Sequence, residues 1–106
     1  MKPVLRLAPA RMDGVAAQTL DFAVDKAFTA ATMRRSTLDF CVRMNSTDER
    51  RAGLANRHRL ITWEGGLPIV HNGTIVGGVG VSGVQRHEDV ECAQAALHSL
   101  GLGNGT

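Results

Sequence analysis

Aromatic residues are scarce in this chain of 106 residues, which contains no Tyr, one Trp and three Phe. Proteins that bind single-stranded nucleic acids combine a basic groove with aromatic side chains on which the bases stack. Here the formal net charge is only +2, so we expect no nucleic-acid partner. No apolar run approaches the ~20 residues that span a bilayer, and the first residues lack a signal-peptide core. We therefore expect a cytoplasmic chain with no membrane partner.

Cysteine is also rare, and the two cysteines, Cys41 and Cys92, form no C-x-x-C pair. We expect two buried, reduced thiols rather than a disulfide framework. The four histidines have no zinc-site spacing, and no nucleophile with its base or paired acid and base can be identified. The neighbouring Asp25 and Lys26 are interpreted as a local, solvated or interface charge pair. The residues alone thus predict no catalytic residue and no metal site.

Length and composition indicate one domain over residues 1–106. Apolar residues make up 43% and charged residues 21% of the chain, which is usual for a folded soluble protein. Apolar spacing of three and four residues predicts a long helix over residues 15–32, with Asp25 and Lys26 turned away from the core. Its expected buried face consists of Leu20, Val24, Ala27, Phe28 and Ala31.

Local signals predict three further helices. Ser36 begins a capping box for a helix through Val42, and Ser46-Thr47 offers an N-cap for a short helix that follows. A closing helix over residues 86–100 ends at Gly101, because glycine suits the left-handed conformation beyond a helix end. Its expected inward residues are Val90, Ala93, Leu97 and Leu100.

Most strand signals lie between the third and fourth predicted helices. Residues 68–71 and 74–77 flank Asn72-Gly73, which is a strong signal for a two-residue hairpin turn. Residues 60–63 are expected to begin this β-region, with Trp63 packed beside the hairpin. Strands joined by so short a turn are antiparallel. A further short strand is expected at residues 4–7.

Residues 78–83 spell G-x-G-x-x-G, a pattern that also marks dinucleotide-binding loops. A Rossmann site needs a parallel βαβ unit and an acidic residue about 20 positions later, and this chain offers neither. Gly77, Gly78 and Gly80 instead leave a strand bare, either for close packing on a helix, which we favour, or for a flat ligand. Gly83 precedes a helix, where free N–H groups suit an anion.

One basic cluster stands out, at residues 50–51 and 57–59. It contains Arg50, Arg51, Arg57, His58 and Arg59. We interpret the cluster as a solvated loop. The alternative is a grip on carboxylates or phosphates, since the guanidinium fork matches both.

Three segments of the chain resemble a known family. Residues 11–14 read R-M-D-G, and residues 23–30 resemble an A-x-x-K-A-x-T-A helix. Residues 65–83, followed by Asp89, resemble G-G-x-P-[IV] … G-x-[IV]-x-G-x-x-G-V-S-G … D. Together they are similar to the GlcG/HbpS family of haem-binding or haem-degrading proteins. The resemblance implies an α+β fold in which helices pack on an antiparallel, profilin-like sheet, assembled into homo-oligomers.

The resemblance also implies haem or a related tetrapyrrole as the cofactor. His71, beside the hairpin turn, is the expected iron ligand. The other expected cofactor-binding residues belong to the glycine-rich segment and are Gly78, Gly80, Ser82 and Gly83.

Family members usually begin with a long helix and one more strand, so this chain is expected to be N-terminally shortened. A missing strand and helix would expose a sheet edge and apolar surface, and we expect a homo-oligomer to complete the sheet. Three functions remain open. The first is a small-molecule binding module for haem, the second an accessory or assembly protein without a ligand, and the third a cofactor-linked enzyme of haem or corrinoid metabolism.

Overall fold

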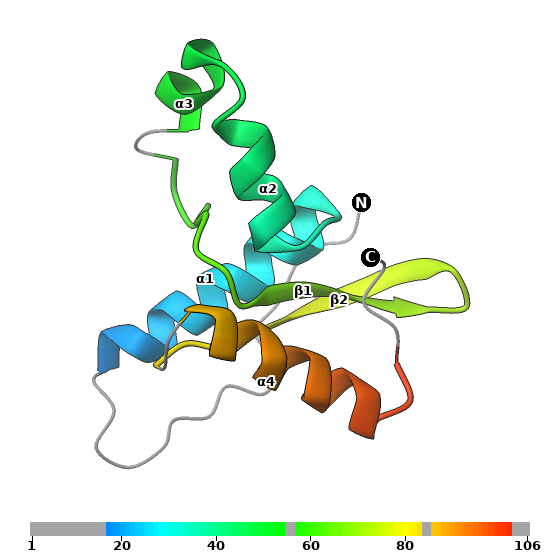
Figure 1. Ribbon diagram of the computed structural model, residues 1–106. Helices are drawn as coiled ribbons and strands as arrows, with labels where there is room; N and C mark the ends of the chain where they lie inside the picture. Colours follow the sequence, from blue (N-terminus) through cyan, green and yellow to red (C-terminus); the bar gives the residue numbers. More distant parts are fainter. Residues whose placement is uncertain (1–16, 55–56, 84–85, 103–106) are drawn as a thin grey trace.

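The computed structural model describes residues 17–54, 57–83 and 86–102, so the strand expected at residues 4–7 lies outside it. The described residues form α1 (Ala17–Met33), α2 (Thr37–Met44), α3 (Asp48–Leu54), β1 (Gly66–His71), β2 (Thr74–Gly80) and α4 (Arg86–Ser99). The β1–β2 hairpin lies between α1 and α4, whereas α2 and α3 extend away from it (Figure 1). The predicted α+β fold class is confirmed.

The hairpin forms at the Asn72-Gly73 turn, as predicted. Asn72 has a φ of 52° and Gly73 a φ of 76°, the two left-handed conformations that a type I′ turn requires. The strands pair antiparallel, and each extends further from the turn than the sequence predicted. The register shifts between Ile69 and Val70, which marks a bulge in the ladder.

One face of the hairpin lies directly against the backbone of α1. A Cβ atom at Gly78 would lie 2.2 Å from the carbonyl oxygen of Ala27, and one at Gly80 would lie 2.0 Å from that of Ala23. Non-bonded carbon and oxygen atoms do not approach so closely, so only glycine fits at both positions. These two glycines therefore serve the close packing of a strand on a helix.

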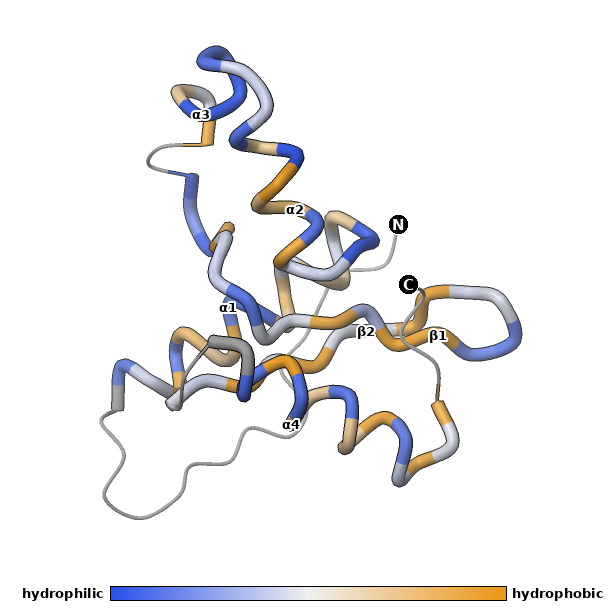
Figure 2. The backbone as a smooth tube through the Cα atoms, in the orientation of Figure 1, coloured by the Kyte–Doolittle hydropathy of each residue, from blue (hydrophilic) through white to orange (hydrophobic). Residues whose placement is uncertain are grey.

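The opposite face of the hairpin packs against α4 and forms an apolar core. Leu67, Ala93 and Leu97 are its buried centre. Figure 2 shows the apolar character of both strands, in contrast with the largely hydrophilic α3. The partly buried side chains around the centre are Ile69, Val79, Val81 and Leu102.

The end of α4 explains why one predicted core residue lies outside the core. Gly101 has a φ of 70°, its N–H donates to the carbonyl of His98, and the N–H of Leu102 donates to that of Leu97. These are the two hydrogen bonds of a Schellman motif, and they bring Leu102 against the core. Leu100, predicted to face inward, is instead 72% exposed.

The buried face of α1 also differs from the predicted one. Lys26, Thr29, Ala30 and Ala31 are buried, whereas Val24 is only half-buried. The prediction turned Lys26 toward solvent because the apolar spacing placed it on the other side of the helix, and a lysine is almost never fully buried unless it is paired. That prediction was wrong, since the fold supplies a partner that is far away in the sequence.

The chain between α3 and β1 runs along α1 without joining the sheet, which corrects the prediction that residues 60–63 begin the β-region. The hydroxyl of Thr29 accepts a hydrogen bond from the N–H of Ile61 and donates one to the carbonyl of Arg59, both at 3.1 Å. These side-chain bonds occupy backbone groups that a strand would pair with its neighbour.

The first turns of α2 and α3 are capped as the sequence predicted. The Ser36 hydroxyl accepts a hydrogen bond from the N–H of Asp39, and the Thr47 hydroxyl accepts one from the N–H of Arg50. α2 continues to Met44, beyond its predicted end, and α3 has no buried residue.

Trp63 packs edge-on against Phe22 of α1, with ring centroids 5.2 Å apart. One expectation about the cysteines is corrected. Cys41 and Cys92 are free thiols, as expected, but Cys92 is exposed and Cys41 is only half-buried. None of the helices in the described part of the chain combines the length and the apolar content that a bilayer crossing needs.

Candidate functional site

A buried ion pair joins α1 to the first turn of α4. The Lys26 ammonium lies 2.9 Å from the Asp89 carboxylate and donates a hydrogen bond to the Val81 carbonyl, also at 2.9 Å. The exposed fractions of the two charged side chains are 1% and 3%. A Cβ atom at Gly65 would lie 2.8 Å from the Asp89 Cβ, so the loop closes over the pair. Charges so enclosed organise the fold and offer no atom to a ligand.

The expected local pairing of Asp25 with Lys26 is therefore wrong. Successive residues of an α-helix point about 100° apart, so Asp25 faces outward while Lys26 faces the core. The Asp25 carboxylate lies 3.6 Å from the Nε atom of Arg59. Each residue thus has its partner on a different segment of the chain.

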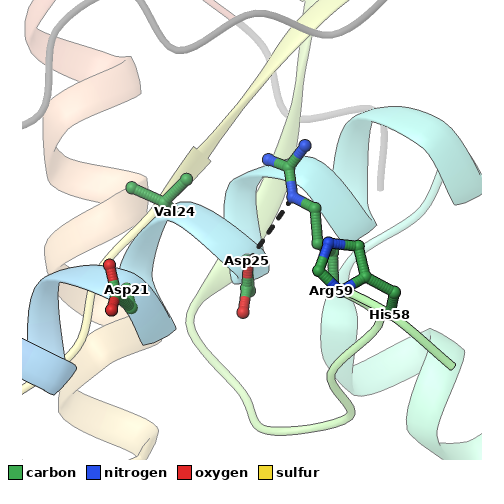
Figure 3. A pocket seen from close by; sticks show the side chains of 5 residues that line it. All are labelled: Asp21, Val24, Asp25, His58 and Arg59. Carbon is green, nitrogen blue, oxygen red and sulfur yellow. Dashed lines mark ion pairs between the residues drawn. The ribbon is translucent and has the colours of Figure 1, made fainter. Parts of the chain in front are cut away.

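An open hollow lies where the chain between α3 and β1 crosses the outer face of α1 (Figure 3). Its volume is about 300 Å³, and it is lined by Asp21, Val24, Asp25, His58 and Arg59. The three α1 residues share one surface because helix positions three and four apart are neighbours. The hollow brings together two carboxylates, one apolar side chain, one imidazole and one guanidinium.

Arg59 is fixed at this hollow from three sides. Its guanidinium carbon lies 3.8 Å from the centroid of the Phe28 ring, its Nε faces Asp25, and its carbonyl accepts the hydrogen bond from Thr29. The two terminal nitrogens point away from Asp25 in Figure 3, and they bind no other side chain among the described residues. They form the edge with which an arginine grips a carboxylate.

His58 precedes Arg59, and its side chain is exposed. An imidazole nitrogen is a common ligand of haem iron. Within residues 17–54, 57–83 and 86–102, no three His, Cys, Asp or Glu side chains gather closely enough to hold a metal ion.

The structure does not bring the five expected cofactor-binding residues into one site. His71 is exposed beside the turn, and Gly80 ends β2 at the other end of the hairpin, roughly 20 Å away at about 3.3 Å per residue. Gly78 and Gly80 face α1, while the half-buried Ser82 and the exposed Gly83 follow β2. Their role toward a ligand stays a prediction.

The hollow was missed because its two halves are distant in the sequence. The basic cluster already indicated that Arg59 could bind a carboxylate, and His58 belonged to the same cluster. The spacing of Asp21 and Asp25 places them on one face of a helix. Nothing in the sequence, however, indicates which loop crosses that face.

Comparison with known proteins gives one family and the same fold. A family model described as haem degrading protein HbpS-like matches residues 5–98. An uncharacterized 15.0 kDa protein of Citrobacter freundii is 34% identical over 94 residues, which cover 82% of this chain and 62% of that protein. The crystal structure of ORFY from Klebsiella pneumoniae has a TM-score of 0.78 at 30% identity, covering 87% of this chain and 64% of ORFY.

The crystal structure of a PduOC complex with haem is also similar. Its TM-score is 0.79 over 92% of this chain and 71% of that one, and its 24% identity establishes likeness of fold alone. For the two relatives described first, the Citrobacter protein and ORFY, this chain spans less than two thirds of their length. The family match extends over most of the sequence and agrees with the resemblance in the glycine-rich segment, and the chain belongs to the HbpS-like family.

Proposed function

We propose that the chain is a small-molecule binding module for haem or a related tetrapyrrole and that it acts as a homo-oligomer. The family description supports a haem-linked role. The observation that carries the proposal is the position of His58 beside Arg59 in the hollow on α1. The imidazole of His58 and the guanidinium of Arg59 match a ligand that has a metal centre and a carboxylate at its edge. The Asp21 and Asp25 carboxylates of the same hollow repel any further acidic group of the ligand.

The size of the hollow limits how such a ligand sits. A volume of about 300 Å³ is at the lower limit for pockets that enclose a small molecule, so the hollow receives one edge of the ring. Phe22 and Trp63 are 36% and 41% exposed, and they lie on the same helix and the same loop as the hollow. Their rings offer apolar contact area. When bound, the haem iron supplies the redox chemistry, and the chain supplies binding and orientation.

His71 remains the alternative iron ligand, with Gly78, Gly80, Ser82 and Gly83 as alternative contacts of the ring. We favour His58, because it lies in a hollow beside a free guanidinium edge. His71 lies at the hairpin turn, outside the residues that line the hollow, and its Nε2 lies 3.3 Å from the Asn72 side-chain amide.

Hemin titration, followed by the shift of the Soret band, tests the proposal. We expect saturation at about one hemin per subunit, as for a single built site. His58→Ala is expected to weaken binding by roughly tenfold or more, the cost of losing one strong contact. His98→Ala is the matched control, because His98 is an exposed histidine in the last turn of α4, and it should bind as the wild type does.

The outcomes separate the alternatives. If hemin binds to this chain no more tightly than to an unrelated basic protein, the chain is not a haem-binding module. The accessory or assembly function is then the better explanation. If His71→Ala abolishes the Soret shift while His58→Ala preserves it, the ligand lies at the hairpin and not in the hollow.

The homo-oligomer is proposed from apolar surface. Large apolar side chains are exposed on α1, α2 and β2 and directly after α4, and exposed apolar surface marks interaction sites where it is contiguous. Light scattering after size exclusion should give a multiple of 11.3 kDa. A well-folded monomer at micromolar concentration would contradict the proposal. These exposed side chains are Phe22, Leu38, Val42, Val76 and Leu100.

A further inference from the structure

Thr29 has a buried hydroxyl that makes two hydrogen bonds, and both go to the loop that carries His58 and Arg59. Its residue exposure is 0%. The hydroxyl donates to the carbonyl of Arg59 and accepts from the N–H of Ile61, both at 3.1 Å. Both bonds join α1 to a segment 30 or more positions further along the chain. A hydroxyl donates and accepts at one atom and can therefore make both bonds, and among residues close to threonine in size serine also carries one.

The loop needs these two hydrogen bonds from Thr29 because its own backbone conformation is unfavourable. Arg59 has a φ of 67°, in the left-handed region that residues other than glycine seldom occupy. Such a conformation persists only where the surroundings impose it. The Ile61 N–H is joined to Thr29 instead of to a neighbouring strand. The hydroxyl thus fixes the backbone on the carbonyl side of Arg59. From this fixed backbone, the Arg59 side chain extends to Phe28 and Asp25.

We propose that Thr29 is the positioning residue of the hollow. Its hydroxyl bridges Arg59 and Ile61, and it thereby sets where His58 and the free edge of the Arg59 guanidinium stand on α1. The inference rests on the proposed function for the identity of the ligand. Thr29 itself touches no ligand, because it is buried beneath the loop.

Thr29→Val removes the hydroxyl at nearly constant shape, and Thr29→Ser keeps it. The chain offers a close control at Thr37, a second buried threonine. The Thr37 hydroxyl bridges one residue of β1 in the same way, accepting from the Gly66 N–H at 3.0 Å and donating to its carbonyl at 3.5 Å. Thr37→Val should therefore disturb the fold to a similar extent without touching the loop that carries His58.

Two readouts are measured on all three variants. The first is hydrogen exchange of the Ile61 amide by NMR, which reports on its hydrogen bond to Thr29 in the absence of any ligand. The second is hemin affinity from the Soret titration. Thr29→Val is expected to accelerate Ile61 exchange and to weaken hemin binding, each roughly tenfold, the effect of one buried hydrogen bond. Thr29→Ser should restore both values, and Thr37→Val should change neither by as much.

Each other outcome has one meaning. If Thr37→Val accelerates Ile61 exchange as much as Thr29→Val, the effect is general destabilisation and the positioning role is overturned. If Ile61 exchange responds but hemin affinity does not, Thr29 positions no ligand group and the inference is also overturned. If the wild type binds no hemin, the proposed function fails, and with it the ligand half of the inference, while the exchange data still decide whether Thr29 holds the loop.

Discussion

Gly80→Ala is expected to lower the free energy of unfolding by about 3 kcal/mol or more, because β2 has no room for a side chain there. The added methyl carbon would lie 2.0 Å from the carbonyl oxygen of Ala23 and 2.7 Å from the amide nitrogen of Ala27. Both are main-chain atoms of α1, so neither can turn aside as the end of a flexible side chain does. The helix would have to shift away from the hairpin, which puts the cost at the upper end of that for overpacked cores.

Thermal unfolding followed by circular dichroism measures this effect. For a domain of this size, a loss of about 3 kcal/mol lowers Tm by at least roughly 12 °C. Gly77→Ala is the matched control on the same strand, because the nearest atom to its Cβ would be Ile69 Cδ1 at 3.8 Å. That is an ordinary contact, and the alanine restricts the unfolded chain. Gly77→Ala should therefore stay within about 1 kcal/mol of the wild type.

Equal Tm values for Gly80→Ala and Gly77→Ala would refute this account of the helix–sheet interface. In that case α1 would not lie against the bare face of β2. The glycines at 78 and 80 would then be open, and their expected contact with a flat ligand would gain support.

Two further predictions concern the ion pairs and the turn. Lys26→Met should lower the free energy of unfolding in urea by about 3–5 kcal/mol, because it leaves the Asp89 carboxylate buried without its cation. Asp25→Asn, which alters the half-exposed pair with Arg59, should cost less than about 1 kcal/mol; equal losses for both would contradict the buried pair. Gly73→Ala meets no atom within 4 Å, but its φ is 76°, so we expect a loss of about 1–2 kcal/mol from backbone conformation alone. Unchanged thermal stability of Gly73→Ala would contradict the type I′ turn.

The packing of β2 also determines which variants can test the ligand site. A bulky residue at Gly78 or Gly80 would displace α1 and change the fold before it changed any contact with a ligand. The side chains of the hollow are different, since His58 is exposed and its removal opens no core cavity. Loss of hemin binding in His58→Ala therefore has a simple interpretation.

The sequence predicted those features of the fold whose causes are local. The Asn72-Gly73 turn, the Ser36 cap and the Gly101 helix end each depend on a conformation or a hydrogen bond within a few residues. Errors arose where a partner came from elsewhere. Leu100 has the helical spacing of a core residue, yet the turn after α4 directs Leu102 inward instead.

The candidate site shows the same division. The basic cluster indicated that Arg59 could bind a carboxylate, and this property follows from the side chain alone. Its position over Phe28 and beside Asp25 follows from the path of the loop across α1. That path is set by the Thr29 hydroxyl, and a threonine within a helical sequence gives no sign of such a partner.

By itself, the sequence determined the order of the helices and of the hairpin, and the family to which the chain belongs. Capping, turn conformation and a glycine-rich motif are all written in short segments, and each can be recognised without knowing the rest of the chain. Only the tertiary structure decided that Lys26 is buried against Asp89, 63 positions away, and that His58 and Arg59 meet Asp21 and Asp25 in one hollow. The physical reason is that such contacts form only when α1, the hairpin and α4 are packed together. How closely α1 packs on the hairpin depends on Gly78 and Gly80 of β2, which have no side chain.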